Sequence, residues 1–254
     1  MTPASTLPTA STGLFTGFVA LSVALAALFT AGVYWSSVRT DATPAVARRR
    51  ATIAAVAAIV WMVATAVAAA RGLLHFESPR TMIALFPAVF ALAAVIALSP
   101  LGRRLATGLP IAVLVGSQSF RVIVELLMHR AYNEGLMPVQ MSYSGRNFDI
   151  VTGLTAIVVA LIVARQGASW SRPLVFAWNT LGVALLANIL VVAVLSAPTP
   201  MRRFTNEPAN VWITQFPWVW LPAVMVLAAI AGHVLVYRRV ALDGGVLRKA
   251  ISFA

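Results

Sequence analysis

Residues 109–130 read LPIAVLVGSQSFRVIVELLMHR, an apolar stretch that is long enough to cross a membrane yet carries charged side chains. At ~1.5 Å per residue, a helix of this length spans the ~30 Å hydrocarbon core of a bilayer. Polar residues follow one another along it at spacings of three and four: Gln118, Arg121, Glu125 and His129. At ~100° per residue, these side chains fall within roughly 80° of one another on one helix face.

The charges on this face must be compensated if the helix lies in a membrane. An ionised side chain near the bilayer centre costs ~2.5–3.5 kcal/mol on insertion scales, so it is retained only where it faces protein, water or a ligand. Arg121 and Glu125 are four residues apart and can pair with each other, which would brace helix packing. The functional interpretation is a cavity in which Arg121 binds an anionic group and Glu125 handles a proton or a cation. His129 would then relay a proton, bind a metal or mark the membrane interface.

The composition of the whole chain indicates a membrane protein. Of its 254 residues, 60% are hydrophobic and 10% are charged, and the mean hydropathy is +0.88. A soluble domain carries about 25% charged residues. The apolar surface of this chain must therefore face lipid, and we predict a single polytopic membrane domain over residues 1–254. The chain has no cysteine, which excludes disulfides, thiolate metal sites and cysteine nucleophiles.

Seven apolar stretches are long enough to span the hydrocarbon, which predicts an all-α integral membrane protein built as a bundle of seven transmembrane helices. Residues 1–12 hold no basic residue, so the first stretch is expected to be a retained helix rather than a signal peptide. Charged and proline-containing breaks separate the stretches. The predicted helices are 13–36, 50–71, 80–99, 109–130, 148–166, 174–196 and 216–238.

Charge decides the predicted orientation of this bundle, which carries a formal net charge of +12. With the C-terminus inside, twelve basic residues fall in cytoplasmic segments and six in outer ones, which favours N-terminus out and C-terminus in. Membrane lipids with anionic headgroups are the expected counter-charge, and nucleic acid is not expected as a partner. The long connections 131–147 and 197–215 then lie outside, so the site is predicted at the extracytoplasmic end.

The segment before the fifth predicted helix, Gly145-Arg146-Asn147-Phe148-Asp149, adds three candidate site residues. Asn147 or Asp149 can cap that helix, where an acid also suits the positive end of the helix dipole. Capping accounts for Asp149 but leaves Arg146, which can face either lipid headgroups or a pocket. We predict one ligand-binding site composed of Gln118, Arg121, Glu125, His129, Arg146, Asn147 and Asp149.

Several functional classes lack the residues that they require. The single lysine, Lys249, lies in the C-terminal tail, which excludes a retinal Schiff base inside the membrane. Paired membrane histidines for haem are not expected, because His233 is predicted toward the membrane face opposite to that of His129. No phosphate-binding glycine loop, HExxH or GxSxG motif occurs in the sequence. We therefore predict no cofactor and no metal site, and the sequence identifies no catalytic residue.

The second half of the chain resembles a widespread family of bacterial seven-helix membrane proteins of uncharacterised function. The most specific part is the Gly-Arg-Asn-Phe-Asp motif that precedes the fifth predicted helix. Further matching residues are Trp178-Asn179, Asn188-Ile189, Leu195–Pro198, Phe216-Pro217 and Leu221-Pro222. The resemblance implies a multi-pass protein of the bacterial cytoplasmic (inner) membrane, but it supplies no activity, substrate or cofactor.

Three classes of function remain open at this point. We favour a protein whose outer-facing pocket binds, senses or transports a small molecule, a lipid or an ion. One alternative is a membrane enzyme acting on a lipid-like substrate, with Glu125 or Asp149 as acid or base and His129 as partner. The other is a structural or assembly subunit of a membrane complex, in which the polar residues serve packing. The sequence determines neither the ligand nor the oligomeric state.

Overall fold

The computed structural model describes residues 8–40, 42–76, 79–166 and 168–252. Throughout these residues the regular structure is helical and no strand occurs, as predicted for an all-α protein. The main helices are α1 (Thr12–Arg39), α2 (Pro44–Ala70), α3 (Pro79–Leu98), α6 (Phe120–Asn133), α7 (Ile150–Gln166), α8 (Ala168–Ser196) and α9 (Leu227–Ser252). The shorter segments are α4 (Pro100–Gly108), α5 (Ile111–Gly116), η1 (Ser117–Ser119), η2 (Val139–Met141), η3 (Trp212–Thr214) and the π-helix η4 (Leu221–Val226).

Several of these helices are long and apolar enough to cross a membrane, as expected of a multi-pass membrane protein. In the described part of the chain five helices meet this test, and a sixth span arises if α3 and α4, bent by 60°, are taken together. Helix α7 is apolar but has only 17 residues. The predicted helix 109–130 corresponds to a span from Ile111 to Asn133, in which the 3-10 turn η1 separates α5 from α6.

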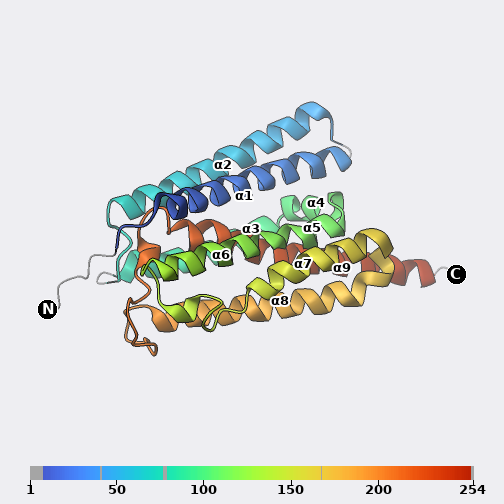
Figure 1. Ribbon diagram of the computed structural model, residues 1–254. Coiled ribbons are helices and arrows are strands. Elements are labelled where there is room, and N and C mark those ends of the chain that lie inside the picture. The colour runs from blue at the N-terminus through green and yellow to red at the C-terminus, as the bar shows by residue number, and fades with distance from the viewer. Residues whose placement is uncertain (1–7, 41, 77–78, 167, 253–254) are drawn as a thin grey trace.

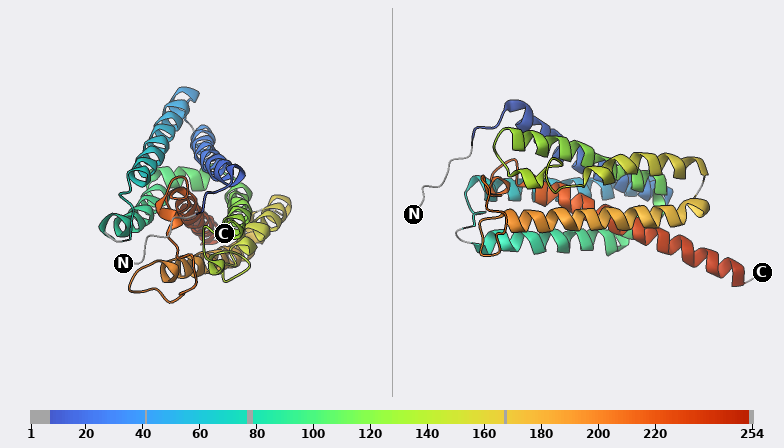
Figure 2. Two further views of the ribbon diagram at one scale, coloured as in Figure 1. Left: turned by 60° about the vertical axis from the view of Figure 1, so that its left-hand side comes forward. Right: turned by 60° about the horizontal axis from the view of Figure 1, so that its bottom comes forward.

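Helix α9 occupies the centre of the bundle, and the other helices surround it (Figure 2, left). It packs against α3, α4, α5 and α8. In the apolar part of the span Leu221–Gly244, which joins η4 to α9, 56% of the residues are buried, compared with 22% in α2. The outer face of α2 exposes apolar side chains such as Ile59 and Val60. Apolar surface of this extent marks a face that lipid covers in a membrane protein.

Two arginines of α9 stabilise the bend between α3 and α4 at one end of the bundle. Arg238 Nη1 donates to the carbonyls of Ala97 (2.7 Å) and Ser99 (2.8 Å). Arg239 Nη1 donates to carbonyls at the end of α4, including that of Ala106 at 2.9 Å. The last carbonyls of a helix have no partner within it, so these guanidinium groups satisfy acceptors that the bend leaves open.

The two long connections, 134–149 and 197–220, lie together at the opposite end, next to the start of α1 (Figure 1). Glu134 ties this end to the N-terminal helix. The backbone N–H and the hydroxyl of Ser11 donate to its carboxylate at 2.7 and 2.6 Å, and Arg130 Nε donates to it at 2.9 Å. Partial burial would raise the pKa of Glu134, but these hydrogen bonds and the charge of Arg130 outweigh it and lower that pKa.

The lowered pKa of Glu134 predicts how attachment of α1 depends on pH. Its stabilisation is fully present above the ordinary pKa of 4.5 and is lost as the pH falls through the lower folded-state value. We expect amide hydrogen exchange in the first turn of α1, corrected for intrinsic rates, to rise as the pH is lowered through this range. Glu134→Gln should show the raised exchange at every pH, whereas Glu207→Gln should behave like the wild type. A wild-type protein with pH-independent protection there would contradict this role.

Candidate functional site

A small pocket lies between α3, α6, α8 and the segment formed by η4 and α9. Its volume is about 70 Å³, and its walls are mostly apolar, with side chains such as Phe120, Leu186 and Met225. Four polar residues also line it: Arg121, Glu125, Asp149 and Asn210. Each of the four is at most 5% exposed. The pocket therefore presents buried polar groups to an apolar space inside the bundle.

Two departures from regular α-helix contribute to this pocket: the non-helical chain before α7 and the π-helix η4. The carbonyl of Ala223, in η4, accepts from the indole Nε1–H of Trp61, in α2, at 2.8 Å. The π-helix contains Pro222, and a proline there frees backbone acceptors that neighbours must satisfy. Single-turn π segments occur frequently at functional sites.

Asp149 lies deeper in the bundle than the sequence suggested. The sequence placed Asp149 near the outer face and Arg121 near mid-membrane, yet the two side chains are in contact. Helix α7 begins partway along the bundle (Figure 1), because the chain before it enters from the end where the long connections lie. Asp149 therefore lies beside Arg121 within the bundle. It stands at the start of a short helix inside the bundle.

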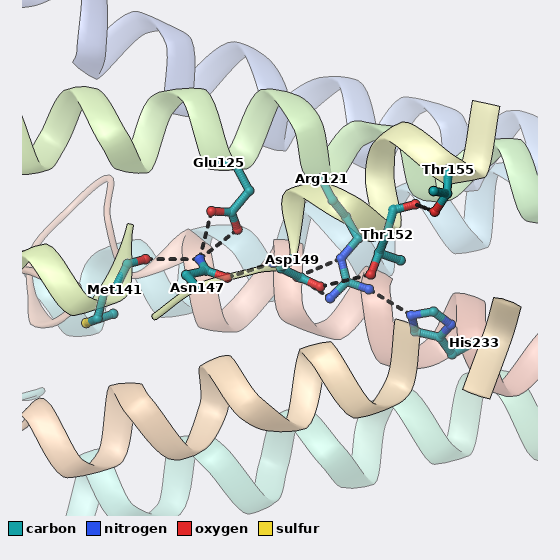
Figure 3. Close-up of polar contacts among 8 residues, drawn as sticks. All are labelled: Arg121, Glu125, Met141, Asn147, Asp149, Thr152, Thr155 and His233. Atoms are coloured by element: carbon teal, nitrogen blue, oxygen red, sulfur yellow. Dashed lines mark hydrogen bonds and ion pairs between the residues drawn. The ribbon is translucent and has the colours of Figure 1, made fainter. Parts of the chain in front are cut away.

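Arg121 forms a buried ion pair with Asp149, as Figure 3 shows. Its Nε and Nη2 both donate to Asp149 Oδ2, the former at 2.8 Å. Asp149 Oδ1 accepts from the hydroxyl of Thr152 at 3.3 Å, in the first turn of α7. The spacing along α6 had allowed a pair between Arg121 and Glu125. The structure pairs Arg121 with an acid from a different segment instead.

His233 of α9 completes the surroundings of Arg121. Arg121 Nη1 donates to His233 Nε2 at 2.7 Å, since a guanidinium has no acceptor. Nε2 therefore accepts, and the ring proton is on Nδ1, which donates to Asn179 Oδ1 at 2.8 Å. Asn179 Nδ2 in turn donates to the His233 carbonyl at 3.1 Å. His233 thus lies beside Arg121 on the polar face of this span, and His129 makes its contacts elsewhere.

Glu125 has a different kind of partner. Asn147 Nδ2 donates to both of its oxygens, at 2.8 and 2.7 Å, and also lies 2.9 Å from the carbonyl of Met141 (Figure 3). Asn147 Oδ1 accepts from the backbone N–H of Asp149 at 3.1 Å, which fixes the direction of the amide. Within the described part of the chain, Glu125 takes part in no ion pair. Its carboxyl group is thus held by one neutral amide.

Asn210 supplies a second acceptor on the pocket wall. Its Nδ2 donates to the carbonyl of Ala193 at 3.1 Å, and its backbone N–H donates to the carbonyl of Ser196 at 2.9 Å. Its Oδ1 is buried and has no hydrogen-bond partner. Gln118 is also buried with an unpartnered Oε1, but it lies beside Gly232 rather than on the pocket wall.

His129 and Arg146 lie apart from this cluster. The ring of His129 stacks on Tyr143 with centroids 4.3 Å apart, and its Nδ1 is 3.2 Å from the hydroxyl of Ser144. Arg146 is exposed, and its guanidinium lies 5.4 Å from the ring centroid of Phe204. Of the predicted site residues, the structure therefore brings Arg121, Glu125, Asn147 and Asp149 together and leaves His129 and Arg146 outside.

Two residues of the site were not predicted. His233 and Asn210 come from distant parts of the sequence, and neither belongs to a periodic pattern. A signal was present in both, because each is a polar residue next to a strongly apolar stretch. Sequence alone could not indicate which helix faces they would meet.

The cluster is rich in hydrogen-bond acceptors. One guanidinium faces two carboxyl groups, and the hydrogen bonds of His233 require its neutral form. Arg121 already donates to Asp149 and His233, so its positive charge is compensated by Asp149 within the protein. Across the described residues no group of three His, Cys, Asp or Glu side chains is placed to hold a metal ion. The arrangement suits a ligand that donates hydrogen bonds or carries positive charge better than an anion.

The fold and the site define a class: a multi-pass helical membrane protein with a partly polar pocket inside its bundle. The chain belongs to the family described as Domain of unknown function (DUF8737), which matches residues 78–241, more than half of its length. All residues that line the pocket fall within the matched part. No match was found among curated proteins or among solved structures.

The Arg121–Asp149 pair predicts a specific pattern of stability in variants. Removing one member leaves a buried charge uncompensated, so Arg121→Met or Asp149→Leu alone should lower the free energy of unfolding by about 3–5 kcal/mol. The double variant Arg121→Met/Asp149→Leu should be more stable than either single variant. Thermal melting followed by circular dichroism in detergent measures this. Glu207→Leu, at the exposed Arg202–Glu207 pair, is the control and should cost at most about 1 kcal/mol. Additive losses in the double variant would show that the two residues act independently.

Proposed function

We propose that the protein is a seven-helix membrane protein whose pocket binds a small molecule, as a sensor, carrier or binding protein. The observation that carries this proposal is the pair of acceptors without a full set of partners, Glu125 and Asn210 Oδ1, on the wall of an otherwise apolar pocket. Burying an acceptor without a partner costs roughly 1–3 kcal/mol. A ligand that donates to these atoms would recover that free energy.

The other two classes of function draw less support from the geometry. A membrane enzyme would need a partner for Glu125 or Asp149, and His129, the expected partner, instead contacts Tyr143 and Ser144. A structural subunit accounts well for Arg121, Asp149 and His233, whose hydrogen bonds join three segments of the chain. It does not account for the unpartnered acceptors at the pocket.

We further propose that the seventh span is α7 together with the chain that leads into it, and that the N-terminus lies outside. The end of the bundle that holds α4 and the α1–α2 turn also holds Arg103, Arg104 and Arg48–Arg50. Basic residues concentrate on the cytoplasmic side of membrane proteins, so this end is assigned to the cytoplasm. The pocket then lies in the extracytoplasmic half of a bacterial cytoplasmic membrane, with lipids around it.

Blocking the pocket tests the binding function. Ala193 lines the pocket, whereas Ala187 lies on the exposed face of the same helix. We expect native mass spectrometry of wild-type protein and Ala187→Phe, released gently from host membranes, to show the same discrete bound mass. Ala193→Phe, folded to the same extent, should lack it. Identical spectra without any bound mass in all three proteins would favour the structural-subunit alternative.

Labelling from outside intact cells tests the orientation. The chain has no natural cysteine, so single cysteines report cleanly. Thr205→Cys lies on the 197–220 connection and Thr107→Cys at the opposite end, and both positions are exposed. A membrane-impermeant maleimide should label position 205 in intact cells and position 107 only after lysis. The reverse pattern would place the pocket in the cytoplasmic half.

A further inference from the structure

The pocket also indicates the chemistry of the molecule that it takes. We propose that it binds the ammonium head of a single-chain aliphatic amine whose hydrocarbon chain extends into the bilayer between α3 and α8. This inference rests on the proposed function, because it names the substrate class of the same pocket. It is carried by three features of the site: its charge, its volume and the position of its mouth.

The charge of the site calls for a cationic donor. No Lys, Arg or His of the described residues lies within ion-pair distance of Glu125, whose two oxygens share a single amide group. Asn210 adds an oxygen with no partner at all. An ammonium group has three N–H donors and no acceptor, so it can donate to Glu125 and to Asn210 Oδ1 together. An anionic head would instead place its own acceptors against those of Glu125 and Asn210.

The volume of the pocket limits how much of the molecule it encloses. Pockets for complete drug-sized ligands measure about 300–1,000 Å³, and an engineered cavity of about 150 Å³ holds one benzene. The cavity here is about 70 Å³, which is room for a head group and a few carbon atoms. A longer apolar chain must therefore leave the pocket, and it needs an apolar path to do so.

The mouth of the pocket provides such a path to lipid. Lining residues on the α6 side, such as Val124, are buried, whereas Phe86 of α3 and Leu190 of α8 are half-buried. One turn beyond Phe86, Phe90 is 45% exposed, and next to Leu190, Val191 is 57% exposed. Apolar side chains thus continue from the pocket wall to the lipid-facing surface. The head would reach Glu125 while the chain stays among lipid tails.

The head group is tested with matched amphiphiles on the full chain in nanodiscs of zwitterionic lipid at neutral pH. Dodecylamine, dodecanol, dodecanoate and butylamine serve as probes, and native mass spectrometry reports bound probe. We expect dodecylamine to bind about tenfold tighter than dodecanol and far tighter than dodecanoate, because charge-assisted hydrogen bonds are about twice as strong as neutral ones. Butylamine, which lacks the chain, should bind weakly. Glu125→Gln should reduce the preference for dodecylamine over dodecanol to about twofold or less, and Glu207→Gln should preserve it.

The mouth is tested independently of Glu125. Leu190→Trp should block dodecylamine binding, whereas Val191→Trp, one residue further round the helix and facing lipid, should leave it unchanged. These variants also cover the case in which Glu125→Gln fails to fold.

The outcomes separate this inference from the function beneath it. Preferred binding of dodecanoate or dodecanol that Leu190→Trp abolishes would overturn the ammonium head but retain a ligand pocket. Tight binding of butylamine would overturn the chain in the lipid. Binding of every probe that is equal in wild type, Glu125→Gln and Leu190→Trp would overturn both the inference and the pocket function.

Discussion

The buried ion pair between Arg121 and Asp149 sets the constraint on which the rest of the site depends. A guanidinium in the middle of an apolar helix must be compensated, and the nearest acid on its own helix, Glu125, does not take that role. The compensating carboxylate comes from the chain before α7, so that chain must descend into the bundle. Helix α7 is consequently short, and its first turn starts where Asp149 meets Arg121. Charge neutralisation at one residue thus decides the path of a whole segment.

A non-helical chain at membrane depth needs partners for its backbone, and asparagine side chains supply them. Asn147 Nδ2 lies 2.9 Å from the carbonyl of Met141, and Asn188 Nδ2 donates to the carbonyl of Arg146 at 2.8 Å. Irregular backbone is tolerated at this depth only where protein covers it or a cavity adjoins it. Because Asn147 serves both Met141 and Glu125, its single NH₂ group is shared among three acceptors. The carboxyl group of Glu125 therefore retains acceptor capacity that faces the pocket.

Hydropathy was sufficient to predict an all-helical protein with several membrane-length spans, because apolar length is a local property of the sequence. It could not show that the stretch around Ser117 tightens into a 3-10 turn or that α7 begins inside the bundle. Periodicity placed Arg121 and Glu125 on one face correctly. The bond between them that the spacing allowed did not form, because Asp149 offers Arg121 a carboxylate that two of its nitrogens reach together. His129 continues the same periodic face but lies one turn closer to the end of α6, where Tyr143 and Ser144 contact it. A helical face defines a direction, and only the packing of other segments decides which of its residues share a site.

The site divides into a half that is satisfied within the protein and a half that is not. Arg121, Asp149, His233 and Asn179 form a continuous chain of hydrogen bonds that joins α6, α8 and α9 to the chain just before α7. A role in helix packing is sufficient to account for this network, since its polar groups are hydrogen-bonded to one another. Glu125 and Asn210 lie on the pocket wall: the two oxygens of Glu125 share one amide group, and Asn210 Oδ1 has no partner. An apolar or smaller residue would pack there without the cost of an unpaired polar atom. Packing alone thus accounts for the first group and not for the second. The free acceptors, together with the adjoining π-helix, are the features that a bound donor would explain.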